Sequence, residues 1–160
     1  MKKTLFVLLV TAALSSCAGL NGRWQHELYD DPMTDHTRET AWISNTSRMF
    51  GGGGQTYAVA EIGCGNVGPF LSFDYGYKTE SASYRIDKNP PVEIQNFWNF
   101  DDVHTSAVTG DAARKGISDI IRGTTLVVRR QSLSALTRSD HVFDITNGKV
   151  LIEEVLSKCW

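Results

Sequence analysis

Short segments in which hydrophobic and polar residues alternate run through most of the chain from residue 23 onwards. In the segment 55–62, Tyr57, Val59 and Glu61 alternate with small or aliphatic residues, the period of a strand with one buried face. Alternating or β-prone segments recur about every ten residues, with turn formers between them, as in antiparallel sandwiches. We expect strands at 23–29, 39–44, 55–62, 70–77, 83–87, 92–100, 124–130 and 141–145.

The remaining segments predict turns, loops and a polar connection. The segment 30–35 is rich in Asp and contains Pro32, which indicates a turn, and the segment 45–54 is expected to be a loop. The glycines Gly51–Gly54 are not followed by the Gly-Lys-Ser/Thr of a phosphate loop, so a hairpin loop is the favoured interpretation. The segment 131–140 is interpreted as a polar connection.

Two segments have the period of a helix instead. Within 109–122, Ala113, Ile117 and Ile120 share one face, and Gly123 follows as a helix-ending residue. From Lys149 to Lys158 the hydrophobic residues form a single stripe, which consists of Leu151, Ile152, Val155, Leu156 and Cys159. We therefore expect a mainly β (α+β) fold: an antiparallel sandwich or barrel-like sheet with two short helices, the last one C-terminal.

The N-terminus has the layout of an export signal. Lys2 and Lys3 precede an uncharged, mostly aliphatic segment, 4–14, which is too short to span a bilayer. The sequence Leu14-Ser15-Ser16-Cys17 that follows resembles the lipobox of bacterial lipoproteins. This resemblance implies a signal peptide at 1–16, cleavage before Cys17, acylation of Cys17 and a tether at 17–22 before one domain at 23–160. The alternative is a plain signal peptide with a chance cysteine.

The lipobox also implies a location. By the sorting rule of such lipoproteins, Ala18 after the acylated cysteine indicates the outer membrane rather than the inner one. We therefore expect a periplasm-facing domain that is attached to the outer membrane through its lipid.

The charge of the mature chain limits its partners. Without Lys2 and Lys3, 14 basic residues remain against 18 acidic ones, a net charge of −4. A nucleic-acid binder or a polybasic membrane-surface protein would carry a basic face, so neither class is expected. We expect a protein partner in the envelope.

The cysteines suggest a disulfide. Of the three, Cys17 is assigned to the lipid, and Cys64 and Cys159 remain in a compartment where disulfides form. We predict a Cys64–Cys159 bond. The alternative is two unpaired thiols, with Cys64 as a nucleophile and His104 or His141 as its base.

No catalytic, metal or cofactor motif stands out in the sequence. Asp35 and His36 are adjacent and would point apart in a strand or turn, and the four histidines lack metal-ligand spacing. No Gly-x-Ser-x-Gly elbow is present. We therefore expect a non-enzymatic protein without metal or cofactor.

Most aromatic residues are expected to lie in the core. The alternative is that the surplus of aromatic residues in 70–77 and 97–100 forms a binding patch or a carbohydrate platform.

The order of motifs from Trp24 to the terminal Cys159-Trp160 resembles a known family. Between these ends lie the segments Asp31–Asp35, Tyr84–Asp87 and a strand centred on Trp98. This order resembles the VasI family associated with type VI secretion, and more loosely the invasion-associated locus B family, both of small exported β-rich proteins. The candidate binding residues lie in these segments and are Asp31, Asp35, Arg85, Asp87 and Trp98, with Arg85 and Asp87 more typical of structural ion pairs.

The resemblance implies an accessory or binding module of the envelope, associated with type VI secretion, and supplies no catalytic residue. A second hypothesis is an inhibitor that occludes a partner, such as a lysozyme inhibitor or a prophage-encoded superinfection-exclusion lipoprotein. A third, an envelope hydrolase, is disfavoured by the missing motifs.

Overall fold

The computed structural model describes residues 22–31, 36–48, 55–65, 68–75, 81–94, 97–100, 103–132 and 136–159. The predicted signal peptide, Cys17, the tether up to residue 21, Asp35 and Gly51–Gly54 lie outside the described residues. Within the described part, no helix is long and apolar enough to cross a membrane.

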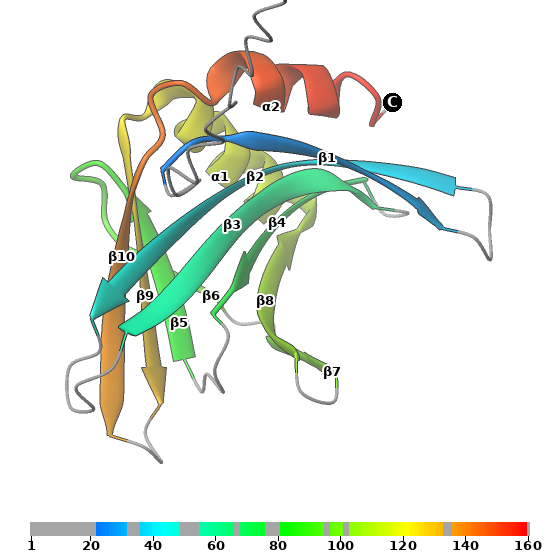
Figure 1. Ribbon diagram of the computed structural model, residues 1–160. Helices are drawn as coiled ribbons and strands as arrows, with labels where there is room; N and C mark the ends of the chain where they lie inside the picture. The colour runs from blue at the N-terminus through cyan, green and yellow to red at the C-terminus, as the bar shows by residue number, and fades with distance from the viewer. Residues whose placement is uncertain are drawn as a thin grey trace, which may run out of the picture.

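The described chain forms two antiparallel sheets and two helices (Figure 1). The six-stranded sheet has the order β1-β2-β3-β4-β8-β7, and the four-stranded sheet has the order β10-β9-β5-β6. The strands of the first sheet are β1 (Gln25–Asp31), β2 (His36–Arg48), β3 (Gln55–Gly65), β4 (Gly68–Asp74), β7 (Phe97–Phe100) and β8 (Val103–Thr109). Those of the second sheet are β5 (Ser81–Ile86), β6 (Val92–Ile94), β9 (Thr125–Ser132) and β10 (Thr137–Asp144). The mainly β fold predicted from the sequence is confirmed.

The helices are α1 (Gly110–Arg122) and α2 (Lys149–Leu156), at the two predicted places. Ala113, Ile117 and Ile120 of α1 are buried, as are Ile152 and Val155 of α2. The predicted apolar stripes therefore face the protein interior.

The hydrophobic core lies between the inward faces of both sheets and the helices. On β3, Ala58, Ala60 and Ile62 are buried, whereas Tyr57, Val59 and Glu61 face outwards, as the alternation predicts. Phe73 and Tyr75 are buried in this core as well, which confirms the core interpretation for these two aromatic residues. Phe70 is 9% exposed and pairs with Gly63 on the outward face of the sheet. At about 25 cal/mol per Å² of apolar surface, such burial is the main force that holds the sheets together.

Four features of the fold differ from the sequence-based expectation. The segment 92–100 contains β6 and β7, which belong to different sheets, so the prediction of one strand is wrong. The predicted polar connection 131–140 is also wrong, since β9 extends to Ser132 and β10 begins at Thr137. β2 extends to Arg48 into the predicted loop, and β8 was not predicted at all.

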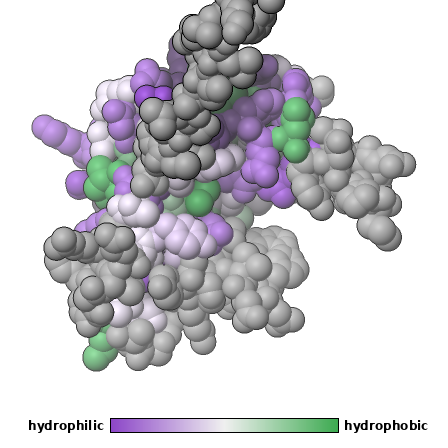
Figure 2. Space-filling model, viewed as in Figure 1, coloured by the Kyte–Doolittle hydropathy of each residue, from purple (hydrophilic) through white to green (hydrophobic). Residues whose placement is uncertain are grey.

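In the part of the chain that the structure describes, exposed hydrophobic residues are scattered rather than gathered. On the face seen in Figure 2, hydrophobic residues form small separate areas among hydrophilic ones. The large exposed ones come from different elements and loops: Leu28, Tyr57, Val92, Leu136, Val142 and Val150. Single exposed residues of this kind are ordinary, so the sheet faces must be judged by their polar chemistry.

Candidate functional site

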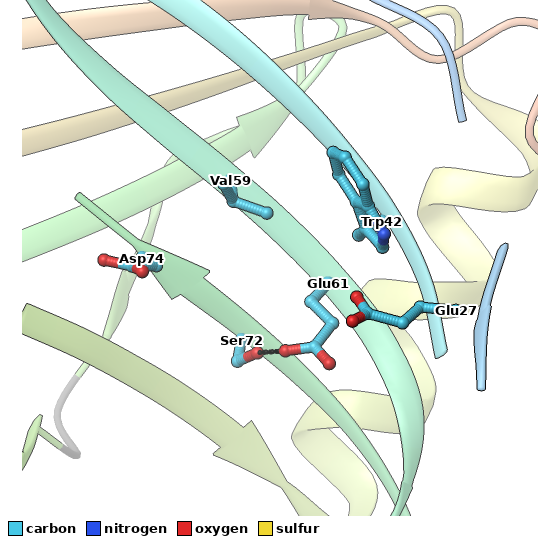
Figure 3. Close-up of a pocket in the computed structure, with 6 residues that line it drawn as sticks. All are labelled: Glu27, Trp42, Val59, Glu61, Ser72 and Asp74. Carbon is cyan, nitrogen blue, oxygen red and sulfur yellow. Dashed lines mark hydrogen bonds between the residues drawn. The ribbon is translucent and has the colours of Figure 1, made fainter. Parts of the chain in front are cut away.

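A hollow of about 300 Å³ lies on the outward face of the six-stranded sheet (Figure 3). We call it the acidic hollow. It is lined by one residue of β1, one of β2 and two each of β3 and β4, which are Glu27, Trp42, Val59, Glu61, Ser72 and Asp74.

The strand register brings these residues together. Trp42 of β2 is the direct partner of Glu61 of β3, and Glu61 is the direct partner of Ser72 of β4. Val59 and Asp74 form the next outward pair along β3 and β4. Directly opposite side chains in an antiparallel sheet lie about 5 Å apart, so an aromatic ring and carboxylates become neighbours although they are distant in sequence.

Hydrogen bonds fix Glu61 on this face. Its Oε1 accepts a hydrogen bond from the Arg38 guanidinium at 3.2 Å, and its Oε2 accepts one from the Ser72 hydroxyl at 3.1 Å. The Arg38 guanidinium also lies 4.5 Å from the centre of the Phe70 ring. Partly exposed contacts of this kind contribute about 0.5–1 kcal/mol each, so they orient Glu61 more than they stabilise the fold.

A glycine allows the Phe70 ring to lie beside this cluster. A Cβ at Gly63 would stand 2.8 Å from the Phe70 ring and 2.8 Å from Thr40 Cγ2. Gly63 therefore leaves the space in which Phe70 supports Arg38.

The hollow collects negative charge beside an aromatic ring. Figure 3 shows Glu27 and Glu61 directed toward each other near Trp42, with Asp74 farther along β4 beyond Val59. Several carboxylates on one surface attract a basic group from solution, and an indole ring adds a cation–π contact. The chemistry of this hollow therefore suits a cationic side chain of a partner.

The structure does not bring the predicted binding residues together. Asp31 ends β1 and Trp98 lies in β7, at opposite edges of the six-stranded sheet; only their backbones are described. Arg85 is exposed on β5 of the other sheet, and Asp87 lies in the turn that follows β5. Asp35 lies outside the described residues. Among the described residues, the candidate binding residues therefore lie at several separate places.

Asp87 has a local structural role. It lies in the turn after β5 with φ 53°, so it does not continue the strand face of Arg85 as expected. Its carboxylate accepts hydrogen bonds from the Thr124 hydroxyl at 2.7 Å and from the backbone N–H groups of Thr124 and Thr125 at 3.1 and 2.9 Å. These hydrogen bonds hold the pKa of Asp87 below its usual range and join the turn to the start of β9.

The predicted disulfide is present. Cys64 near the end of β3 and Cys159 after α2 are joined, with their Cα atoms 5.4 Å apart. Cys64 shares the inward face of β3 with Ile62, and Ile152 and Val155 of α2 pack into the same core. The bond therefore attaches the terminal helix to the six-stranded sheet and leaves no thiol on Cys64.

A polar cluster is buried on the inward face of the second sheet. The Arg130 Nε donates a hydrogen bond to the Ser139 hydroxyl at 2.8 Å, and His141 Nε2 lies 3.2 Å from the same hydroxyl. Burial, and then the charge of Arg130, lower the pKa of His141 to about 4, so its imidazole is neutral at pH 7. This cluster is part of the interior and does not open onto the acidic hollow.

No metal site is found in the part of the chain that the structure describes. There, no group of three or more His, Cys, Asp and Glu side chains is arranged to hold a metal ion.

Sequence reasoning missed Glu27, Trp42, Ser72 and Asp74 as site residues. Alternation assigns Glu61 to the outward face of β3, but it does not say which residues of β2 and β4 stand opposite. That information lies in the register, which depends on the length of each turn.

Comparisons with known proteins give no relative. No family model matches the chain, and no curated protein or solved structure matches it either.

Proposed function

We propose that this chain is a non-enzymatic, lipid-anchored protein of the bacterial envelope that binds a basic partner protein through the acidic hollow. The observation that supports this function is the arrangement of Glu27, Glu61 and Asp74 around Trp42 on an outward sheet face. Exposed charges of one sign speed the approach of an oppositely charged partner, and an aromatic residue adds contact area at the centre.

The geometry of the acidic hollow also suits binding of a partner rather than catalysis. Arg38 and Ser72 hold the Glu61 carboxylate in one orientation, which suits binding to a surface of fixed shape. The family resemblance suggests an accessory role in type VI secretion as the specific process. A hydrolytic activity that disappears in Asp35→Asn or His36→Ala would contradict a non-enzymatic function.

The second candidate function is an inhibitor or exclusion lipoprotein. The acidic hollow favours it to the same extent, because blocking a basic enzyme or phage protein needs the same charge complementarity. The identity of the bound protein separates the two: a secretion component supports the first function, and a wall-degrading enzyme or phage protein supports the second.

A charge reversal tests the hollow. The full-length protein is captured from envelope membranes with its bound proteins, for wild type and Glu27→Lys. We expect Glu27→Lys to lose a basic protein that wild type retains at low salt and releases at high salt. Glu154→Lys makes the same change on the exposed side of α2 and is the control. Equal capture by wild type and Glu27→Lys would contradict the proposal.

A further inference from the structure

β1 is the sheet edge that is most open to a further strand. Among the described residues, the two sheets have four edge strands, which are β1, β7, β6 and β10. β6 and β7 have only three and four residues. β10 lies against the other sheet, where the Asn45 side chain of β2 donates a hydrogen bond to the backbone carbonyl of Val142. β1 instead pairs with β2 over seven consecutive residues without a bulge, so its other edge is a long, regular row of backbone groups.

The middle of β1 is uncovered on both faces. His26, Glu27 and Leu28 are all exposed, and Leu28 is 58% exposed. Successive residues of a strand point to opposite faces, so the described chain covers neither face at this place. β1 also contains neither Pro nor Lys, the residues that commonly protect an edge strand. An incoming strand can therefore reach the backbone N–H and C=O groups of this edge.

The charge of β1 limits what can pair with it. The strand contains Glu27, Asp30 and Asp31 and no Lys or Arg. If β1 of a second copy paired with this one, acidic residues of both copies would come together, which is unfavourable. A segment that carries Lys or Arg meets the opposite situation. The edge therefore shares the charge preference of the acidic hollow beside it.

The two faces of β1 select different side chains. Glu27 lines the acidic hollow on the outward face, and Leu28 lies on the opposite face, where it pairs with Glu39 of β2. A strand added to this edge would lie about 4.8 Å beyond β1, with its side chains alternating between the same two faces. Basic side chains on the outward face would then lie beside Glu27, and apolar side chains on the other face would cover Leu28.

We propose that the basic partner adds an extended segment to β1, in which Lys or Arg side chains directed toward the acidic hollow alternate with apolar side chains that lie beside Leu28. This inference rests on the proposed function and specifies how the partner binds. Backbone hydrogen bonds to the edge of β1 supply affinity, and the alternation of side chains supplies specificity.

Fluorescence anisotropy with the full-length protein in detergent micelles tests this mode of binding. The probe is a labelled, capped peptide of the same length as β1, in which Lys and Val alternate. N–H groups of alternate residues point to the same edge of a strand, so N-methylation of every Lys blocks one edge of the peptide and N-methylation of every Val blocks the other. We expect the unmodified peptide and one N-methylated form to bind at low salt. The other form should bind at least about tenfold more weakly, because it loses the backbone hydrogen bonds to β1.

Two further measurements locate the added strand. Hydrogen exchange of the β1 amides should slow when the unmodified peptide binds, and exchange of β7, the opposite edge of the sheet, should not change. Leu28→Ala removes apolar surface beside the added strand and should weaken the peptide severalfold with an unchanged melting temperature. Val150→Ala makes a similar change at an exposed position of α2 and is the control, with unchanged affinity expected.

Equal affinity of the two N-methylated forms would show that the peptide is held by charge alone, which would overturn strand addition and leave the proposed function in place. No binding of the unmodified peptide, or slower exchange at β7 instead of β1, would overturn the proposal as well. A dimer whose β1 amides are protected without peptide would overturn it in favour of a second copy at this edge. The proposed function itself is decided by the capture experiment with Glu27→Lys, which does not depend on the peptide.

Discussion

On the inward face of β9 and β10, a few positions where a hydrophobic residue would be expected are occupied by polar residues. Arg130, Ser139 and His141 are all buried, and the Ser139 hydroxyl contacts both of its neighbours. Removing one member of such a group takes a hydrogen bond from a buried neighbour, which costs about 1–3 kcal/mol. The residues therefore form a structural unit inside the sandwich.

His141 predicts a pH dependence of stability. The pKa of His141 is about 4 in the folded state and about 6.5 when the chain is unfolded, so between these values only the unfolded chain binds the proton. The contribution of His141 is therefore complete above pH 6.5 and declines as the pH falls toward 4. Urea denaturation at pH 7.5, 5.5 and 4.5 should show this decline in wild type.

The control for this prediction is His141→Leu, which lacks the titrating group. Its free energy of unfolding should be lower at pH 7.5, because the contact with Ser139 is gone. Its decline between pH 6.5 and 4.5 should be smaller than that of wild type. Parallel curves for the two proteins would show that His141 does not titrate with folding.

At the scale of the elements, the attachment of α2 to the six-stranded sheet depends on one covalent bond. The Cys64–Cys159 disulfide closes a loop with a sequence separation of 95 residues. In the chain-entropy model, a loop of this size corresponds to about 4–5 kcal/mol, a large part of the stability of a single domain. We predict that Cys64→Ala and Cys159→Ala lose the same stability in urea, that the double variant is no worse, and that α2 detaches first.

Free-thiol titration of the folded, exported protein checks the same bond. We expect no reactive thiol from either cysteine. Full titration of Cys64 and Cys159 would refute the bond and restore the hypothesis of a nucleophilic Cys64.

The elements themselves were predictable wherever the pattern was local. Both helices, the faces of β3 and the disulfide follow from periodicity and from the cysteine count, because these signals lie within a few residues or depend on composition. The first residues of β10 were not predicted, because a serine such as Ser139 is typical of a loop. In the structure, the Ser139 hydroxyl accepts a hydrogen bond from Arg130 of the neighbouring strand. β6 and β7 were merged because alternation does not reveal a change of sheet. The acidic hollow needs the register of four strands, which no local pattern carries.

For the whole molecule, the lipid anchor is the first prediction. The sequence Leu14-Ser15-Ser16-Cys17 after Lys2 and Lys3 predicts acylation of Cys17, which lies outside the described residues. Cys17→Ser should accumulate as the precursor or be released from the membrane. Mass spectrometry of the wild-type N-terminus should show a lipidated Cys17, and an unmodified N-terminus would contradict the predicted attachment.

Site-specific photo-crosslinking in intact envelopes tests most directly whether the acidic hollow is the partner surface. A photoreactive phenylalanine derivative replaces Trp42 at the centre of the hollow, or Val150 on the exposed side of α2 as the control. We predict a defined adduct with a basic envelope protein at position 42 that weakens when Glu27→Lys is added, and no such adduct at position 150. The same adducts at both positions, or none at position 42, would contradict the proposed function.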